Sequence, residues 1–316
     1  MQSRRSDVTK GAIGGVVVVI AVVVIYLLVD NRKLFANTIL NGLTLAGLYF
    51  LVASGFTLVF GLMRQVNMAH GSLYLLGAYV GWSAARAADS WFLGVAAGFL
   101  SMAVAGVLLQ IGIFRRMEGQ DLRQTLVTIG ISIVAADLML AIWGGNTYQF
   151  EPPTWLAGTT SLFFVKYSTY RLVILGVAVV IGIGLWLFLN RTPIGMMIRA
   201  GVDDRAMLAC SGVNVQRVFA VTFALGAGLA GLAGVVGGSW LSISPGEDTR
   251  YLLASLVVVI VGGMGSITGA AIGALLIGLS EHLGLAYWPT YGVVLTFVIM
   301  VAVLAFRPQG IVGRPA

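Results

Sequence analysis

The chain has 316 residues, of which 59% are hydrophobic and 10% charged, with a formal net charge of +7. Soluble domains carry about 25% charged residues, so a chain this apolar is expected to lie in lipid and not in water. The single cysteine, Cys210, excludes an internal disulfide, and with two histidines the chain offers no typical zinc site. The positive charge is spread over loops, which indicates a membrane-orientation signal and not a nucleic-acid surface.

Residues 1–33 are predicted to form an N-terminal tail and an extra transmembrane helix ahead of the main membrane domain, 34–316. Arg4, Arg5 and Lys10 precede an apolar run over 11–29, an order also found in secretory signals. The run is longer than the apolar core of a typical signal, and no small-residue cleavage site follows it. We therefore assign it as the first spanning helix.

Apolar runs predict an all-α polytopic bundle of eight to ten transmembrane helices, because about 20 apolar residues are needed for each crossing. The candidate spans are 12–29, 36–62, 70–86, 92–114, 125–144, 171–189, 217–240, 250–264, 267–285 and 291–306. The eighth and ninth spans are short and interrupted by glycine.

With ten spans, both termini are expected in the cytoplasm, because cytoplasmic segments carry the excess of Lys and Arg. The twelve basic residues then placed inside are Arg4, Arg5, Lys10, Arg115, Arg116, Arg123, Arg191, Arg199, Arg205, Arg217, Arg307 and Arg314. The six placed outside are Arg32, Lys33, Arg86, Lys166, Arg171 and Arg250. The long loop 145–170 is thus predicted to face outward and the charged loop 190–216 inward.

Glycine, with 42 residues, is expected to mediate helix packing, since close backbone approach drives helix association in lipid. Gly265, Gly269 and Gly273 form a GxxxGxxxG stripe, and a second series recurs at every third residue from 228 to 237. Packing within one subunit is the favoured interpretation, and a seam between two subunits is the alternative.

A weak internal repeat is possible at an offset of 201 residues. The matching residues of its first copy are Gly61, Met63, Ala69, Leu75 and Gly77, and those of its second copy are Gly262, Met264, Ala270, Leu276 and Gly278. Each copy places a short break between two apolar stretches, and transporters built from repeats often carry such breaks near the substrate path.

The densest group of polar residues between apolar stretches lies in the break at 61–71, and its candidate residues are Arg64, Gln65, Asn67, His70 and Gly71. Such groups could hydrogen-bond a polar substrate, or they could cap the broken helix ends. Both interpretations stay open from the sequence. Asp137 lies within a predicted span, where we expect a structural pair. Glu281 and His282 are expected at an interfacial helix end.

The loop 190–216 carries both charge signs together with apolar positions, and Pro193 and Gly212 are its start and stop signals. This pattern predicts a short amphipathic helix pair. The pair could lie on the bilayer, or it could dock into a groove on a cytoplasmic partner.

Four blocks of sequence, in order, resemble the branched-chain amino-acid ABC permeases of the LivH type. They are FTLVFGLMRQVNMAHGSLYLLGAY at 56–79, the loop at 195–214, VGGMGSITGAAIGALLIGLSE at 261–281 and RPQGIVG at 307–313. In the loop, the resemblance implies an ATPase-coupling role, and the residues concerned are Gly195, Arg199, Ala200, Asp203, Asp204 and Gly212. Two departures are the added N-terminal helix and Met68, which is also familiar in the related urea and short-chain amide permeases.

The resemblance implies one permease subunit of a multi-subunit importer in the bacterial inner membrane, translocating branched-chain or other small amino acids. Its implied partners are a paralogous permease or a second copy, two cytoplasmic ATP-binding subunits and a periplasmic substrate-binding protein. The sequence has no G-x-x-x-x-G-K-[ST] stretch, so ATP would be bound by the partner, and no cofactor, metal or catalytic residue is expected in this chain. The alternatives are a urea or amide permease and a stand-alone secondary transporter or channel; an intramembrane enzyme fits the sequence least.

Overall fold

The computed structural model describes residues 32–63, 67–117, 119–162 and 165–313. The predicted first span, 12–29, therefore lies outside the described residues. In chain order the elements are α2 (Arg32–Met63), α3 (His70–Ala88), α4 (Trp91–Gly112), η1 (Phe114–Met117), α5 (Asp121–Trp143), η2 (Thr154–Leu156), β1 (Thr159–Leu162), β2 (Val165–Ser168), α6 (Thr169–Arg191), α7 (Pro193–Asp203), α8 (Arg205–Cys210), α9 (Val215–Leu241), α10 (Glu247–Gly262), α11 (Ile267–Tyr287), η3 (Pro289–Tyr291) and α12 (Gly292–Phe306).

The predicted helical membrane bundle is confirmed, and each predicted span from 36–62 onward falls on a helix. Within the described residues, six helices are long and apolar enough to cross a membrane, namely α2, α4, α5, α6, α9 and α11. The other three predicted spans correspond to α3, α10 and α12, which are shorter or less apolar. The chain is thus a multi-pass membrane protein.

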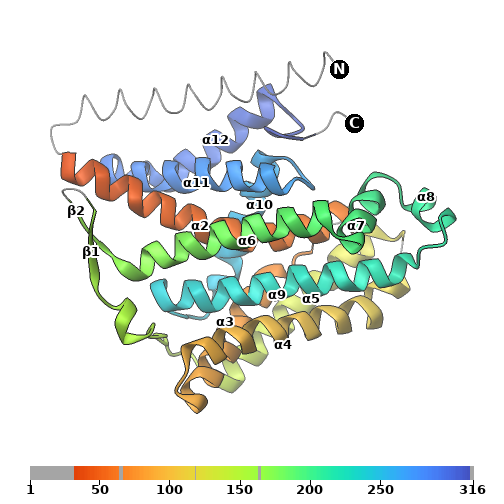
Figure 1. Ribbon diagram of the computed structural model, residues 1–316, viewed down its shortest axis with the longest axis horizontal. Helices are drawn as coiled ribbons and strands as arrows, with labels where there is room; N and C mark the ends of the chain where they lie inside the picture. The colour runs from red at the N-terminus through yellow and green to blue at the C-terminus, as the bar shows by residue number, and fades with distance from the viewer. Residues whose placement is uncertain (1–31, 64–66, 118, 163–164, 314–316) are drawn as a thin grey trace.

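The loops 145–170 and 190–216 lie at opposite ends of the bundle, as Figure 1 shows. We call these the hairpin end, after β1 and β2, and the α7 end. The sequence did not predict the antiparallel hairpin, in which Thr160 lies opposite Tyr167. The Tyr167 hydroxyl donates to Asn41 at 3.1 Å, which ties the hairpin to α2, and Arg171 of α6 donates to the same amide oxygen at 2.6 Å. Burial raises the pKa of Tyr167 despite its bond to Thr44 and the nearby Arg171 charge, so its hydroxyl remains a neutral donor.

Helix α9 lies deep in the bundle, because its glycines let three neighbours approach closely. Gly228 faces the ring of Phe99 in α4, while Gly234 lies directly against the backbone carbonyl of Tyr74 in α3. On the side toward α2, Gly226 packs on the backbone of Gly55. As a result, 72% of the apolar window of α9 is buried inside the chain, against 11% for α5.

The predicted glycine stripe at 265–273 is corrected in one respect. Gly269 and Gly273 lie on the face of α11 that packs on α10, against the carbonyl oxygens of Gly262 and Val258. Gly265 precedes α11, in the turn after α10, and its φ of +80° is a conformation that favours glycine. The stripe therefore consists of two helical glycines and one turn glycine.

The two helix breaks of the possible internal repeat meet at the α7 end. Gly61 lies in the last turn of α2, and a Cβ built on it would lie 3.0 Å from the Cα of Gly265 and 3.7 Å from the Val202 side chain of α7. Two helix–break–helix units, α2–α3 and α10–α11, thus touch at their breaks, with α7 beside the contact.

Candidate functional site

The break before α3 is stabilised by Asn67, which is buried. Its side-chain oxygen accepts from the Ala69 amide at 3.0 Å, and its backbone oxygen accepts from the His70 amide at 3.2 Å. The next amide, that of Met68, donates to Thr128 of α5 at 3.1 Å. These bonds satisfy backbone groups at a helix end, which is the capping interpretation. Arg64 and Gln65 lie outside the described residues.

His70 is fully buried at the first residue of α3 and binds the neighbouring helix α2. Its Nε2 lies 3.0 Å from the Val52 carbonyl oxygen, and its ring meets Phe56 edge-on at 5.3 Å between centroids. The next residue, Gly71, packs on the Asp248 carbonyl at the start of α10. Both residues therefore hold α3 against its neighbours, and neither borders open space.

We expect His70→Ala to destabilise the chain by about 3 kcal/mol, because it removes a fully buried ring and leaves a cavity. His70→Phe keeps an aromatic ring, somewhat larger than imidazole, and loses the bond to Val52, so we expect a smaller cost of about 1–2 kcal/mol. Thermal unfolding in detergent measures both. A His70→Ala variant that unfolds like the wild type yet fails in transport would instead place this side chain in the substrate path.

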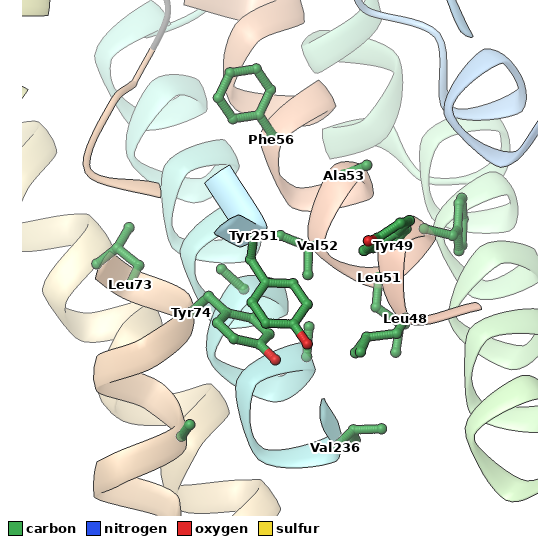
Figure 2. Close-up of a cluster of buried hydrophobic side chains, with 14 of the residues drawn as sticks. Leu48, Tyr49, Leu51, Val52, Ala53, Phe56, Leu73, Tyr74, Val236 and Tyr251 are labelled. Carbon is green, nitrogen blue, oxygen red and sulfur yellow. The ribbon is translucent and has the colours of Figure 1, made fainter. Parts of the chain in front are cut away.

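A polar cluster that the sequence did not predict surrounds the start of α10. We call it the α10 cluster, and its members are Tyr49, Tyr74, Glu247, Asp248, Arg250, Tyr251 and Glu281. Ser72 joins it from α3, since its hydroxyl donates to Asp248 at 3.4 Å. Figure 2 shows the Tyr74 and Tyr251 rings against one another with their hydroxyl oxygens on the same side; the centroids are 4.1 Å apart. The cluster joins α2, α3, α10 and α11.

Glu281 is the centre of the charged part of this cluster. It accepts a hydrogen bond from Tyr49 at 2.8 Å, and Arg250 lies 3.9 Å from its other carboxylate oxygen. The Glu281 side chain is 12% exposed, whereas that of Arg250 is 52% exposed. The expectation of a simple interfacial helix end is therefore wrong for Glu281. The sequence shows Tyr49 within one predicted span and Glu281 near the end of another, but it does not show that these distant residues are in contact.

The loop 190–216 folds as the predicted helix pair, α7 and α8. Thr192 caps α7 by accepting from the Gly195 amide at 3.0 Å, and Pro193 occupies the first turn. Asp204 caps α8 by accepting from the amides of Ala206 and Met207 at 2.8 and 3.0 Å. Both helices begin where the sequence carries a capping side chain.

The predicted coupling residues lie on different sides of this pair. Gly195 is buried against the Phe188 carbonyl of α6, so it joins α7 to the end of that helix. Arg199 is exposed and donates to Asn190 at 2.7 Å. Ala200, Asp203 and Asp204 are also exposed, and Gly212 has a φ of +78° in the turn after α8. The exposed apolar side chains of the pair are Ile194, Met196 and Met207.

An open cavity of about 820 Å³ lies at the opposite end, between the α3–α4 connection and residues 149–154. It is lined by aromatic, charged and proline side chains, including Trp82, Trp91, Arg86, Asp89, Glu151 and Pro152.

The sequence of the chain is similar to those of known permease proteins. Residues 38–304 match the family described as the branched-chain amino acid transport system / permease component. The high-affinity permease protein LivH of Escherichia coli K12 is 32% identical over 89% of this chain and 96% of its own length, and BraD of Pseudomonas aeruginosa is 30% identical over the same shares. LivM of Escherichia coli K12 is 26% identical over 85% of this chain and 68% of its own length. Among solved structures there is no significant match. The chain belongs to the permease family of the branched-chain amino acid transport systems.

Proposed function

We propose that this chain is the membrane permease subunit of an ATP-driven importer for branched-chain or other small amino acids in the bacterial inner membrane. The observation that carries the proposal is the contact of α7 with the two meeting breaks, where Val202 lies beside Gly61 and Gly61 beside Gly265. A partner that moves α7 would act directly on the ends of α2, α10 and α11. Family membership supplies the transport class.

The energy comes from a cytoplasmic ATPase that binds the α7–α8 pair. The pair has a buried face, which includes Ile198 and Leu208, and an exposed face, which includes Met196 and Met207. An amphipathic helix that presents apolar side chains at the end of a membrane bundle fits a groove on a protein partner. ATP-dependent binding at this face needs only to favour one of two pore conformations in order to drive alternating access.

A periplasmic binding protein delivers the substrate at the hairpin end. The cavity of about 820 Å³ supports this assignment, because it is open and lined by aromatic and charged side chains of both signs. Such a surface suits recognition of a soluble protein, whose contacts combine aromatic anchors with complementary charges. A second permease subunit completes the pore, and the likeness to both LivH and LivM supports a partner related to this chain.

Reconstitution with the encoded partner subunits tests the function. We expect leucine, isoleucine or valine, delivered by the binding protein, to stimulate ATP hydrolysis and uptake into vesicles. Stimulation by urea or short-chain amides in their place would change the substrate class and keep the transporter class. Robust transport by the isolated chain without an ATPase would support a secondary transporter or channel and overturn the proposal.

Asp204→Ala is expected to weaken association with the ATPase subunit about fivefold, because loss of the α8 cap costs about 1 kcal/mol. Asp204→Ser provides the matched control, since a serine hydroxyl can also cap the helix while it carries no charge. Retention of the ATPase on the immobilised permease measures both. Equal weakening by both variants would assign Asp204 a charged contact with the partner and not a capping role.

A further inference from the structure

Helix α5 is the least buried of the six candidate spans, with 11% of its apolar window covered by the described residues. It packs mainly on α3, through a face that contains Thr128 and Met139. Near its end, the Trp143 ring stacks on Tyr79 of α3 at 5.0 Å. The rest of the α5 surface makes no extensive contact with another of the described helices.

Asp137 lies on this open surface. It is exposed, and the described residues provide it with no hydrogen bond or ion pair, so the expected structural pair within the chain is wrong. Residues two apart on a helix point about 200° apart, so Asp137 points away from the buried Met139. It lies six residues before Trp143, about 9 Å along the axis, which places it inside the span and not at its edge.

Apart from Asp137, α5 exposes large apolar side chains such as Ile133 and Val134, like the other weakly buried spans. On α4 the exposed large side chains include Leu100, Val104 and Leu108, and on α6 they include Val180 and Ile183. These faces are suited to lipid. A carboxylate within a span is costly in hydrocarbon, so such groups face a bundle interior or a water-filled cavity.

Small residues show how a second subunit could approach. Gly130 is on the same side of α5 as Ile133 and Asp137, at spacings of three and four residues, and a Cβ built on it would meet nothing within 4 Å. A glycine on an open helix face permits close contact with another helix. The exposed carboxylate and this glycine lie two turns apart.

We propose that this face of α5, defined by Gly130, Ile133 and Asp137, is turned toward the second permease subunit, and that Asp137 lines a hydrated substrate path between the two subunits. The proposal rests on the proposed function and adds the location of the path. In a two-fold or pseudo-two-fold pair, a face at the axis meets its counterpart. A carboxylate there needs water or a cation, and the ammonium group of an amino acid is such a cation.

Cysteine labelling tests the path without a transport measurement. In a Cys210→Ser background, we expect Asp137→Cys in the assembled complex to react with a membrane-impermeant methanethiosulfonate at least tenfold faster than Val180→Cys, the lipid-facing control on α6. Saturating amino acid, delivered by the binding protein, is expected to slow the reaction. Equal rates for the two cysteines would overturn the proposal.

Co-purification of the two permease subunits tests whether this face of α5 forms their interface. Gly130→Leu is expected to reduce co-purification of the second permease subunit at least tenfold, whereas Gly184→Leu, at an equally open position on α6, leaves it unchanged. Both isolated variants are expected to unfold at the temperature of the wild type, because at neither position does an added Cβ come within 4 Å of a described neighbour. If Gly130→Leu co-purifies the second subunit as the wild type does, this face of α5 is not the subunit interface.

Measurements of transport by the complex test this proposal separately from the proposed function on which it rests. We expect Asp137→Asn to raise KM for uptake at least tenfold, and Asp137→Glu to recover most of that loss. If the wild-type complex transports amino acids and Asp137→Asn leaves KM unchanged, only the role of the carboxylate is refuted. Absence of amino-acid-stimulated ATP hydrolysis in the fully assembled wild-type complex would refute the proposed function itself.

Discussion

Gly71→Ala and Gly234→Ala are each expected to destabilise the chain by about 3 kcal/mol and to lower the yield of folded protein. A Cβ at Gly71 would overlap the Asp248 carbonyl oxygen of α10, and one at Gly234 would overlap the Tyr74 carbonyl oxygen of α3. Overpacking a filled core costs about 1–3 kcal/mol. Here the obstacle is backbone, which cannot change rotamer, so we expect each substitution to reach the upper end of that range. Thermal unfolding in detergent and the yield of monodisperse protein measure the effect.

Gly176→Ala is the matched control, because Gly176 lies on the exposed side of α6 with nothing within 4 Å of an added Cβ. Alanine is the better helix former by up to about 1 kcal/mol, so this variant is expected to be at least as stable as the wild type. If Gly71→Ala or Gly234→Ala also unfolded like the wild type, the close helix contacts described around α3 would be wrong.

Tyr49→Phe is expected to destabilise the chain by about 1.5–3 kcal/mol, the usual contribution of a hydrogen bond to a charged group. The substitution removes the donor 2.8 Å from Glu281, whose side chain is 12% exposed, and leaves the carboxylate poorly satisfied. Tyr291→Phe, at an exposed tyrosine in η3, is the control and is expected to change stability by less than about 0.5 kcal/mol.

A double-mutant cycle isolates the Tyr49–Glu281 interaction. Once Glu281 is replaced by leucine, the hydroxyl of Tyr49 loses its acceptor, so Tyr49→Phe should then cost little. We expect the combined variant to be more stable than the sum of the two single effects by at least about 1 kcal/mol. Additive effects of the two substitutions would show that the contact contributes nothing to the stability of the α2–α11 packing.

The helical part of the fold was predictable because lipid imposes a simple rule. A span must be apolar over a length set by the bilayer and must satisfy its own backbone, so each helix is visible in its own sequence. The α7–α8 pair was predictable for a related reason, since Pro193 and Gly212 are local start and stop signals. The hairpin at 159–168 was not, because its short strands depend on contacts with α2 such as Tyr167–Asn41.

The candidate site was predicted only in part. The break at 61–71 was found from its polar residues, but the sequence left capping and substrate contact equally open. In the structure the side-chain oxygen of Asn67 accepts from the Ala69 amide, and the His70 ring lies 3.0 Å from the Val52 carbonyl oxygen. Substrate contact by either residue stays a prediction. The α10 cluster was missed, since Tyr49 and Glu281 are 232 residues apart in the chain.

The sequence by itself determined that the chain is a membrane bundle, where its helices lie and which family it belongs to, because these properties follow from local hydrophobicity, capping residues and ordered motifs. Only the tertiary structure decided which polar groups satisfy one another. In the structure, Glu281 contacts Tyr49 and Arg250. Gly265 lies in a turn and not on a helix face, and Asp137 is exposed. The physical reason is that hydrogen bonds and charge pairs depend on atoms a few ångströms apart, and in this bundle those atoms come from helices that are distant in the chain.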